Sequence, residues 1–503
     1  MKRTLLRAAI RTGGRALPRG PIVGLGMAVA LLLGGCTVGP DFVRPTPPQG
    51  ERYTQRPMAP STVSADGLAQ HFEPGAQIAA DWWHLFNSRE IDALVSKAVA
   101  DNPSLQAAQA TLRQSQDNLR AGYGVFYPQL DFTGGASREK FSGAQTGEAS
   151  SARIFNLYTL NTSVSYTLDV FGGNRRTVEG LAAQVDYQHC TELGAYLTLS
   201  GNIVNTVIAR AAYAAEIDAT EQLIGLLKEQ VQVTQAQVEG GTAPYANLLS
   251  AQSQLASTEA TLAPLRQRLD QSEHLLAVLT GHTPAETVVE QIDLASLALP
   301  SDLPVTLPSE LVHQRPDILA AEAQLHSASA NIGVATAAMF PQFTLNGSFG
   351  QLSNAGSTLL RSASSVWGLA ADLATPLFRG GTLWYEKKAA EDAYQAALAN
   401  YRQSVLSGLE QVADTLRALE HDAENVEAQA RAVDAASGAL KLLQANYEAG
   451  IVTYLQVLVA DAQYHQASIA YLQARGQRLQ DTAALFVALG GGWWNKDQDT
   501  AAQ

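Results

Sequence analysis

The stretch that begins Asn174-Arg-Arg-Thr-Val-Glu179 and ends Ala236-Gln-Val-Glu239 contains no proline and no cluster of turn-forming residues. Its apolar residues recur at helical spacing, in pairs and series such as Ile203/Val207, Val204/Ile208 and Leu223/Leu227/Val231. A single helix over residues 174–239 would be on the order of 100 Å long, at a rise of about 1.5 Å per residue. Globular helices average about 11–12 residues, so this helix is expected to cross a distance. A second stretch of the same kind runs from Gly381 to Ala449.

Composition limits the class of protein. The chain has 503 residues, of which 46% are hydrophobic and 16% are charged, which is typical of a folded protein with few charges. Its formal net charge is −13. Non-specific nucleic-acid binding depends on Lys and Arg side chains that neutralise phosphates, so no nucleic-acid partner is expected for this acidic chain.

The N-terminus resembles a lipoprotein signal peptide over residues 1–35. Residues 1–20 are basic, and Ile22–Leu33 form an apolar segment that is too short to span a bilayer. The segment ends in Leu33-Gly34-Gly35-Cys36, where small residues admit a lipoprotein signal peptidase and the Cys36 thiol would carry the lipid. Thr37 stands where an inner-membrane retention signal usually has Asp, which favours the outer membrane. The alternative is a cytosolic protein with an apolar leader and a chance cysteine.

The rest of the chain is an internal duplication. Asn102-Pro103 corresponds to Arg315-Pro316, and Tyr127-Pro128 corresponds to Phe340-Pro341, both at a shift of 213 residues. The segment from Gly240 to Tyr245 corresponds to the segment from Ala449 to Tyr454 at a shift of 209. Each half is therefore expected to contain helices, two strands, a long helix, a turn and a further helix.

These matches divide the mature chain into five parts. They are a lipidated tether (36–80), a first repeat (81–281), a linker (282–308), a second repeat (309–490) and a C-terminal tail (491–503). The first repeat is expected to have strands at about 128–170, a long helix over 174–239 and a helix over 244–280, and the second to have strands at about 341–378, a long helix over 381–449 and a helix over 453–489. The family resemblance described below implies that the tether and the linker are equatorial segments.

Apolar and polar residues alternate in the predicted strands. Residues on one face include Ile154, Tyr158, Leu160, Val164, Tyr166, Leu168, Phe343, Leu345 and Phe349. Such alternation over ten or so residues is typical of transmembrane β-strands, and exposed hairpins of a soluble domain are the alternative. Four strands cannot close a barrel, because bacterial outer-membrane barrels have at least about eight and open edges are not tolerated in lipid. Three chains with twelve strands in total give the simplest closed barrel.

The helices carry coiled-coil spacing. Leucine recurs every seventh residue at Leu248, Leu255, Leu262, Leu269 and Leu276. In the second half, steps of four and three connect Val405, Leu409, Val412, Leu416, Leu419, Ala423, Val426, Ala430, Val433, Ser437 and Leu440. Pro264 interrupts the first series, so a kink or break is expected there. A soluble coiled-coil stalk would show the same seams.

Five motifs are Cys36-Thr-Val-Gly-Pro-Asp-Phe-Val-Arg-Pro45, Asp81-Trp-Trp83, Arg315-Pro-Asp317, Phe340-Pro341 and Leu489-Gly-Gly-Gly-Trp493. Together they resemble the outer-membrane efflux lipoproteins, the OprM-type branch of the TolC-like outer membrane factors, over essentially the whole mature chain. The resemblance implies a mainly α-helical fold with a membrane β-barrel. The expected assembly is a homotrimer with a twelve-stranded β-barrel on a twelve-helix α-barrel tunnel with an equatorial domain.

The resemblance also implies partners and a location. The chain would be anchored by lipid in the outer membrane and would extend into the periplasm. There it would dock to a periplasmic adaptor (membrane fusion) protein and, through it, to an inner-membrane pump of the RND type. The implied adaptor contacts are the two helical turns, at Gly240, Gly241, Thr242, Ala243, Gly450, Ile451 and Val452.

The same resemblance places a gate near the second turn. Several relatives have an aspartate nine residues after the turn glycine, and this chain has Val459 there. Leu455 and Gln456 lie nearby, and Asp461 follows two residues later. We therefore expect a periplasmic gate formed by Leu455, Gln456 and Val459 that is apolar and closes by dewetting.

Enzymatic chemistry is not expected. The nine histidines are scattered, no C-x-x-C motif exists, and Gly347-Ser-Phe-Gly350 lacks the order of a nucleophile elbow. No metal or cofactor is therefore expected. Cys190 could in principle pair with Cys36 but is expected to be an unpaired small residue. The pairs Trp82/Trp83 and Trp493/Trp494 are expected to serve packing or interface anchoring, with sugar stacking as the alternative.

These observations predict a passive outer-membrane exit duct of a tripartite efflux system. It would conduct drugs, other small toxic compounds or metal ions that the pump delivers. One alternative is the outer-membrane duct of a type I protein secretion system. The other is a lipid-anchored coiled-coil spacer without a pore. The exported compound does not follow from the sequence.

Overall fold

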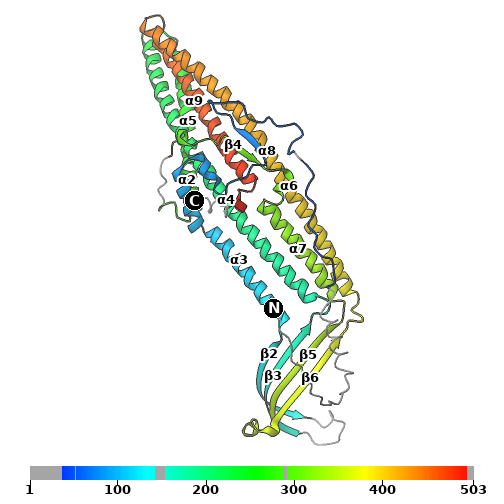
Figure 1. Cartoon of the computed structure of the whole chain (residues 1–503). Coiled ribbons are helices and arrows are strands. Elements are labelled where there is room, and N and C mark those ends of the chain that lie inside the picture. Colours follow the sequence, from blue (N-terminus) through cyan, green and yellow to red (C-terminus); the bar gives the residue numbers. More distant parts are fainter. Residues whose placement is uncertain (1–36, 51, 142–152, 287–291, 496–503) are drawn as a thin grey trace, which may run out of the picture. The chain divides into compact units, whose positions relative to one another are not determined.

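A computed structural model describes residues 37–50, 52–141, 153–286 and 292–495 (Figure 1). The chain divides into two compact units. The first unit holds residues up to Asp41, Ala121–Gly180 and Ser329–Asp392, and the second holds Phe42–Arg120, Leu181–Ala328 and Ala393–Gln503. Both units therefore combine segments from the two halves of the duplicated sequence.

The first unit is built around a four-stranded antiparallel sheet. Its strands are β2 (Gln129–Phe141), β3 (Arg153–Leu168), β5 (Gln342–Ser353) and β6 (Ser365–Ala374), in the order β2-β3-β5-β6. The two hairpins come from the two repeats and join where β3 pairs with β5. β2 and β6 are the edge strands of this sheet in the described part of the chain.

One face of this sheet is apolar and the other is polar. Phe132, Phe349 and Trp367 lie on the apolar face and are 70%, 59% and 75% exposed, so the rest of the described chain does not cover them. On the polar face the Asn346 amide donates to the Asp372 carboxylate at 2.7 Å. The alternation predicted for these strands is therefore present, and it leaves a large apolar surface for another environment.

Four long helices form two matching pairs. α4 (Gly173–Glu239) and α8 (Thr382–Glu448) have 67 residues each, and α5 (Tyr245–Leu279) and α9 (Tyr454–Ala488) have 35 each. The shorter helices α3 (Pro103–Gly122) and α7 (Pro316–Ala337) precede the strands of their repeats. None of the helices in the described part of the chain is both long and apolar enough to cross a bilayer.

Helix packing follows the heptad seam in part. On α8 the predicted seam residues Val405, Val412, Leu416, Leu419, Ala423 and Val426 are buried, whereas Ala430, Val433, Ser437 and Leu440 are only half-buried. α5 continues through Pro264 as one helix, so of the expected kink or break the break is wrong and the kink stays a prediction. The cost of the proline is limited to the loss of one backbone hydrogen bond and local crowding, and the long helical segments on both sides outweigh it.

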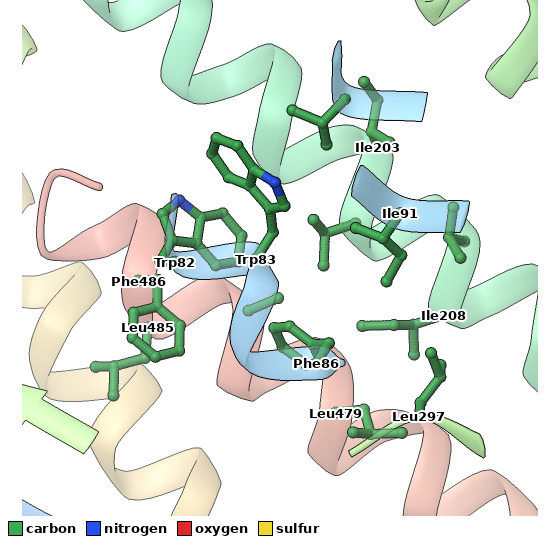
Figure 2. Close-up of a cluster of buried hydrophobic side chains, with 14 of the residues drawn as sticks. Trp82, Trp83, Phe86, Ile91, Ile203, Ile208, Leu297, Leu479, Leu485 and Phe486 are labelled. Carbon is green, nitrogen blue, oxygen red and sulfur yellow. The ribbon is translucent and has the colours of Figure 1, made fainter. Parts of the chain in front are cut away.

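The main core lies in the second unit, where a short helical turn, Trp82–Phe86, packs against α4 and α9. Figure 2 shows Trp82, Trp83 and Phe86 inserted among the residues of these helices. The Trp82 ring stacks on Phe486 at 5.3 Å between centroids and 13° between planes. The expectation that Trp82 and Trp83 are packing residues is confirmed, because both are buried.

Segments before and between the repeats pair with each other. β1 (His71–Pro74) forms a parallel pair with β4 (Asp302–Val305). The helices α2 (Arg89–Asp101) and α6 (Pro308–Leu311) complete the described elements of this part of the second unit. The residues expected to form an equatorial tether and linker thus meet in one small sheet.

A half-buried pair of carboxyl groups lies between α8 and α9. Asp422 of α8 is next to Asp481 of α9, and burial together with the Asp481 carboxyl raises the pKa of Asp422 to about 7. The nearby Arg478 guanidinium is directed to other acceptors, the Gln70 side chain at 3.0 Å and the Thr62 hydroxyl at 3.2 Å. One Asp422 oxygen, Oδ2, has no hydrogen-bond donor in the described structure.

Replacement of Asp422 by Asn should stabilise the protein in a pH-dependent way. The pKa of Asp422 is higher in the folded than in the unfolded chain, so the folded chain holds more protons between about pH 4 and pH 7, and the native protein loses stability as the pH rises through this range. We expect D422N to gain about 1–2 kcal/mol at pH 8 after allowance for solvent screening, and little at pH 4. Thermal unfolding at both pH values measures this. The exposed Asp434 on the same helix supplies the control variant D434N, and an equal effect of D422N at pH 4 and pH 8 would contradict the prediction.

Candidate functional site

The two pairs of long helices close in turns of the same backbone geometry. After α4, the N–H of Thr242 donates to the carbonyl five residues earlier at 2.8 Å, and Gly241 has φ +73°. After α8, the N–H of Ile451 donates to the carbonyl five residues earlier at 2.8 Å, and Gly450 has φ +73°. This is the Schellman arrangement, in which a left-handed glycine ends a helix and its successor bonds back to the last turn.

The residues predicted to contact an adaptor lie on these turns. Both turns are at the same end of the second unit (Figure 1), where the Tyr454 hydroxyl joins α9 to Glu229 of α4 at 2.5 Å. The exposed residues are Gly240, Gly241, Thr242, Gly450 and Ile451, and the half-buried residues are Ala243 and Val452. The two sequence-distant turns thus form one exposed end, with an apolar Ile451 side chain that is 72% exposed.

The predicted gate residues lie at the start of α9, and they differ in exposure and in hydrogen bonding. Leu455 is half-buried, and Val459 is 40% exposed. The Gln456 side chain accepts a hydrogen bond from the N–H of Thr453 at 3.1 Å, and Thr453 in turn caps the backbone of Gln456. This capping box uses the Gln456 side chain to begin the helix, a role absent from the expectations above although the Thr-x-x-Gln pattern signals it.

The first described residues of the chain are held in the first unit by a set of contacts around Arg176, the Arg176 seat. The N–H of Val38 donates to the carbonyl of Phe171 at 3.1 Å. Arg176, 3% exposed, donates to the Val38 carbonyl at 3.3 Å and to the Asp41 carboxylate at 2.7 Å, and it also pairs with Glu179 at 2.7 Å. Cys36 itself lies outside the described residues.

Two glycines allow this segment to approach so closely. Gly39 has φ +91°, and a Cβ on it would lie 2.5 Å from the Cα of Gly333. A Cβ on Gly333 would lie 2.6 Å from the side chain of Arg176. Farther along, in the second unit, Arg44 pairs with Glu322 at 2.6 Å and Phe42 stacks on His326 at 4.4 Å. None of these contacts was predicted from the sequence.

Two of the motifs behind the family resemblance have a structural explanation. The Arg315 guanidinium donates to the carbonyl of Ala488 at 2.6 Å and to the Gln411 side chain at 2.8 Å, so it ties the start of α7 to α9 and α8. In the terminal glycine motif, a Cβ on Gly492 would lie 2.5 Å from two backbone carbonyl oxygens. The indole of Trp493 donates to the Gln314 carbonyl at 2.8 Å, which fits the predicted packing role.

No metal centre is built in the described part of the chain, since no three His, Cys, Asp or Glu side chains there are arranged to hold an ion. Cys190 is buried and free, as expected for an unpaired small residue. Burial raises the pKa of its thiol to about 11, so the thiol stays protonated at neutral pH and is a poor nucleophile.

A comparison with known protein families identifies the family of this chain. The family profile described as "Outer membrane efflux protein" matches residues 94–282 and again 307–491. The chain belongs to the outer membrane efflux protein family. The two matched ranges correspond to the two halves of the duplication, and outer-membrane localisation follows from the family.

Two relatives are similar in sequence to this chain over nearly the full length of both proteins. The pyoverdine export outer membrane protein OpmQ of Pseudomonas aeruginosa is 29% identical, with 88% of this chain and 94% of OpmQ covered. The cation efflux system protein CusC of Escherichia coli O6:H1 is 26% identical, with 93% of this chain and 98% of CusC covered.

Solved structures place the fold among the TolC-like outer-membrane channels. The outer-membrane channel OprN matches with a TM-score of 0.80 at 26% identity, over 91% of this chain and 100% of that one. The open-state MtrE outer membrane channel of Neisseria gonorrhoeae matches with a TM-score of 0.77 at 24% identity, over 91% of this chain and 99% of that one. The predicted fold class is therefore confirmed.

Replacement of Gly39 by Ala should release the N-terminal segment from its seat. Ala is disfavoured at φ +91°, and its Cβ would meet the backbone of Gly333, so we expect a cost of about 2–4 kcal/mol. Hydrogen exchange at the Val38 amide should become faster. Gly67 has φ +76° and nothing within 4 Å of the position that a methyl group would take, so G67A controls for backbone strain alone. Unchanged Val38 protection in G39A would contradict the prediction.

Proposed function

We propose that this chain is the outer-membrane exit duct of a tripartite efflux system. The observation that carries the proposal is the match of the outer membrane efflux protein family to both halves of the duplicated chain. The proposed duct is passive, because the inner-membrane pump supplies the energy. Its cargo would be drugs, other small toxic compounds or metal ions, and no catalytic step is assigned to the chain.

The proposed assembly is a homotrimer. The sheet of the first unit has an uncovered apolar face and two edge strands, β2 and β6. Unpaired backbone groups are too costly in lipid, and four strands are too few to enclose a channel. Pairing β2 of one chain with β6 of the next would remove all edges, and three chains would give a barrel of about twelve strands.

The proposed partners are a periplasmic adaptor and an inner-membrane pump of the RND type. The end of the second unit formed by Gly240–Ala243 and Gly450–Val452 would meet the adaptor. This surface is exposed, and the backbone bonds of its two glycine turns give it a defined shape. An adaptor with an apolar contact residue would complement the exposed Ile451 side chain.

Lipidation of Cys36 would anchor the chain in the outer membrane. The seat around Arg176 holds the segment from Val38 to Asp41 next to Phe171, just after β3 ends. The described chain therefore begins, at Thr37 beside Gly172, near the end of a strand whose apolar face suits lipid. Acyl chains contribute about 0.8 kcal/mol per buried CH₂, so more than one chain would give a firm anchor.

Replacement of Cys36 by Ser should abolish lipid attachment. We expect cells supplied with labelled palmitate to incorporate label into the wild-type protein and none into C36S, because serine has no thiol to accept the diacylglycerol. C190S is the matched control and should be labelled as strongly as the wild type, since that thiol is buried. Label retained in C36S would disprove the anchor.

The proposed periplasmic gate is apolar and now rests on Leu455 and Val459, since the Gln456 side chain serves the helix cap. Conversion of both residues to Ser should let water wet the constriction and raise closed-state conductance in planar bilayers several-fold. I451S alters an exposed apolar residue at the same end outside α9 and should leave the current unchanged. Equal currents from the L455S/V459S variant and the wild type would rule out this gate.

A further inference from the structure

A cavity of about 820 Å³ lies in the second unit between α4, α5 and α9. None of the turn residues lines it, but Val459 of the proposed gate does. Its volume falls within the range of about 300–1,000 Å³ that is usual for small-molecule sites. The lining side chains that bear on the argument are Glu216, Leu223, Leu227, Pro264, Arg268 and Gln473.

The residues of α5 explain why this space is not filled. The face of α5 toward the cavity carries small side chains, including Ser257, Ala260 and Thr261. Pro264 has no N–H, so the carbonyl of Ala260, four residues earlier, lacks its usual helical donor. Both residues line the cavity. The small side chains on this face of α5 leave room for the cavity.

One wall of the cavity carries a buried carboxylate. Glu216 is 5% exposed and accepts a hydrogen bond from the Gln473 amide at 2.8 Å. Arg268 reaches Glu216 only by a longer-range charge interaction and lies 6.0 Å from the Tyr213 ring centroid. Burial raises the pKa of Glu216, as expected for a carboxyl group that lacks a close cation.

The remaining walls combine apolar and amide groups. Leu223 and Leu227 of α4, Leu265 of α5 and Ile469 of α9 present hydrocarbon surface. Hydrogen-bonding amides come from Gln230, Gln254, Gln463, Gln466 and Gln473. Apolar walls with a few convergent polar groups are typical of sites for organic ligands.

We infer that this cavity binds an amphipathic organic cation, whose charged nitrogen pairs with Glu216 and whose apolar body packs between α4, α5 and α9. A cation satisfies the buried carboxylate better than a neutral ligand does, because the ion pair offsets the cost of keeping that charge out of water. The cavity and its carboxylate carry this inference. Use of the site during transport rests on the proposed function as an efflux duct.

The first test measures binding of rhodamine 6G, a fluorescent amphipathic cation, to the purified full-length protein by fluorescence polarisation. E216Q keeps the size and hydrogen bonding of the side chain but removes the charge, so we expect the Kd to rise at least about tenfold. D218N removes a charge from an exposed position of the same helix and should bind as the wild type does. An unchanged Kd in E216Q would overturn the inference.

A second variant tests the space itself. T261F places a ring in the cavity from the α5 side and should weaken rhodamine 6G binding to a similar degree. Fluorescein, an anionic dye of similar size, should bind the wild type at least about tenfold more weakly than rhodamine 6G. Binding of rhodamine 6G that persists in T261F, or equal binding of the two dyes, would disprove the site.

Conductance distinguishes this inference from the proposed function. A wild-type protein that conducts in planar bilayers but binds no rhodamine 6G would refute the cavity site alone. If the wild-type protein binds the dye through Glu216, but neither it nor the L455S/V459S variant conducts, the duct alone is refuted.

Discussion

A long helix is stable in water only where a stripe along it is buried, and two helices of 67 residues impose this requirement on the whole second unit. The requirement is met most fully where Trp82 stacks on Phe486 and Arg315 ties α7 to α8 and α9. The Trp82–Phe486 contact joins the first segment of one repeat to the last helix of the other, and the Arg315 contacts tie the start of the second repeat to its own long helices. Toward the turns, the seam of α8 becomes half-buried beyond Val426. The helices are thus held tightly in one region and more loosely at the end proposed to contact an adaptor.

The two repeats share the backbone geometry of their turns more closely than they share side-chain interactions. Both turns place a glycine at φ +73° and make the same bond five residues back. The helices that follow begin differently: α9 has a capping box at Thr453, whereas Pro244 caps α5 without a side-chain hydrogen bond. One helix pair contributes Val459 to the proposed gate, and the other contributes most of the cavity wall. Under the two proposals, two copies of one backbone would serve different tasks.

Repeats, strands and helix seams could be predicted from the sequence because each leaves a local periodic pattern. The alternation of β3 and β5 is visible within single segments, and the register in the sheet follows it. The seat around Arg176 has no such pattern, since Arg176 and Asp41 are 135 residues apart and the close approach of Gly39 to Gly333 depends on the fold. The family resemblance implies a gate role for Gln456, whereas the local Thr-x-x-Gln pattern indicates a helix cap. The cavity also escaped prediction, because it needs stripes from three helices to face one another.

The equal helix lengths constrain how such a chain can change during evolution. α4 matches α8 at 67 residues, and α5 matches α9 at 35, so both repeats build their helix pair from the same two lengths. One inserted residue would advance a turn by about 1.5 Å and rotate every later side chain by about 100°. Insertions or deletions of about seven residues, made in all four helices, keep both the seams and the matched helix lengths intact. Homologues with longer or shorter helices should therefore differ in coordinated heptad steps, and a single-repeat length change should be rare among functional descendants.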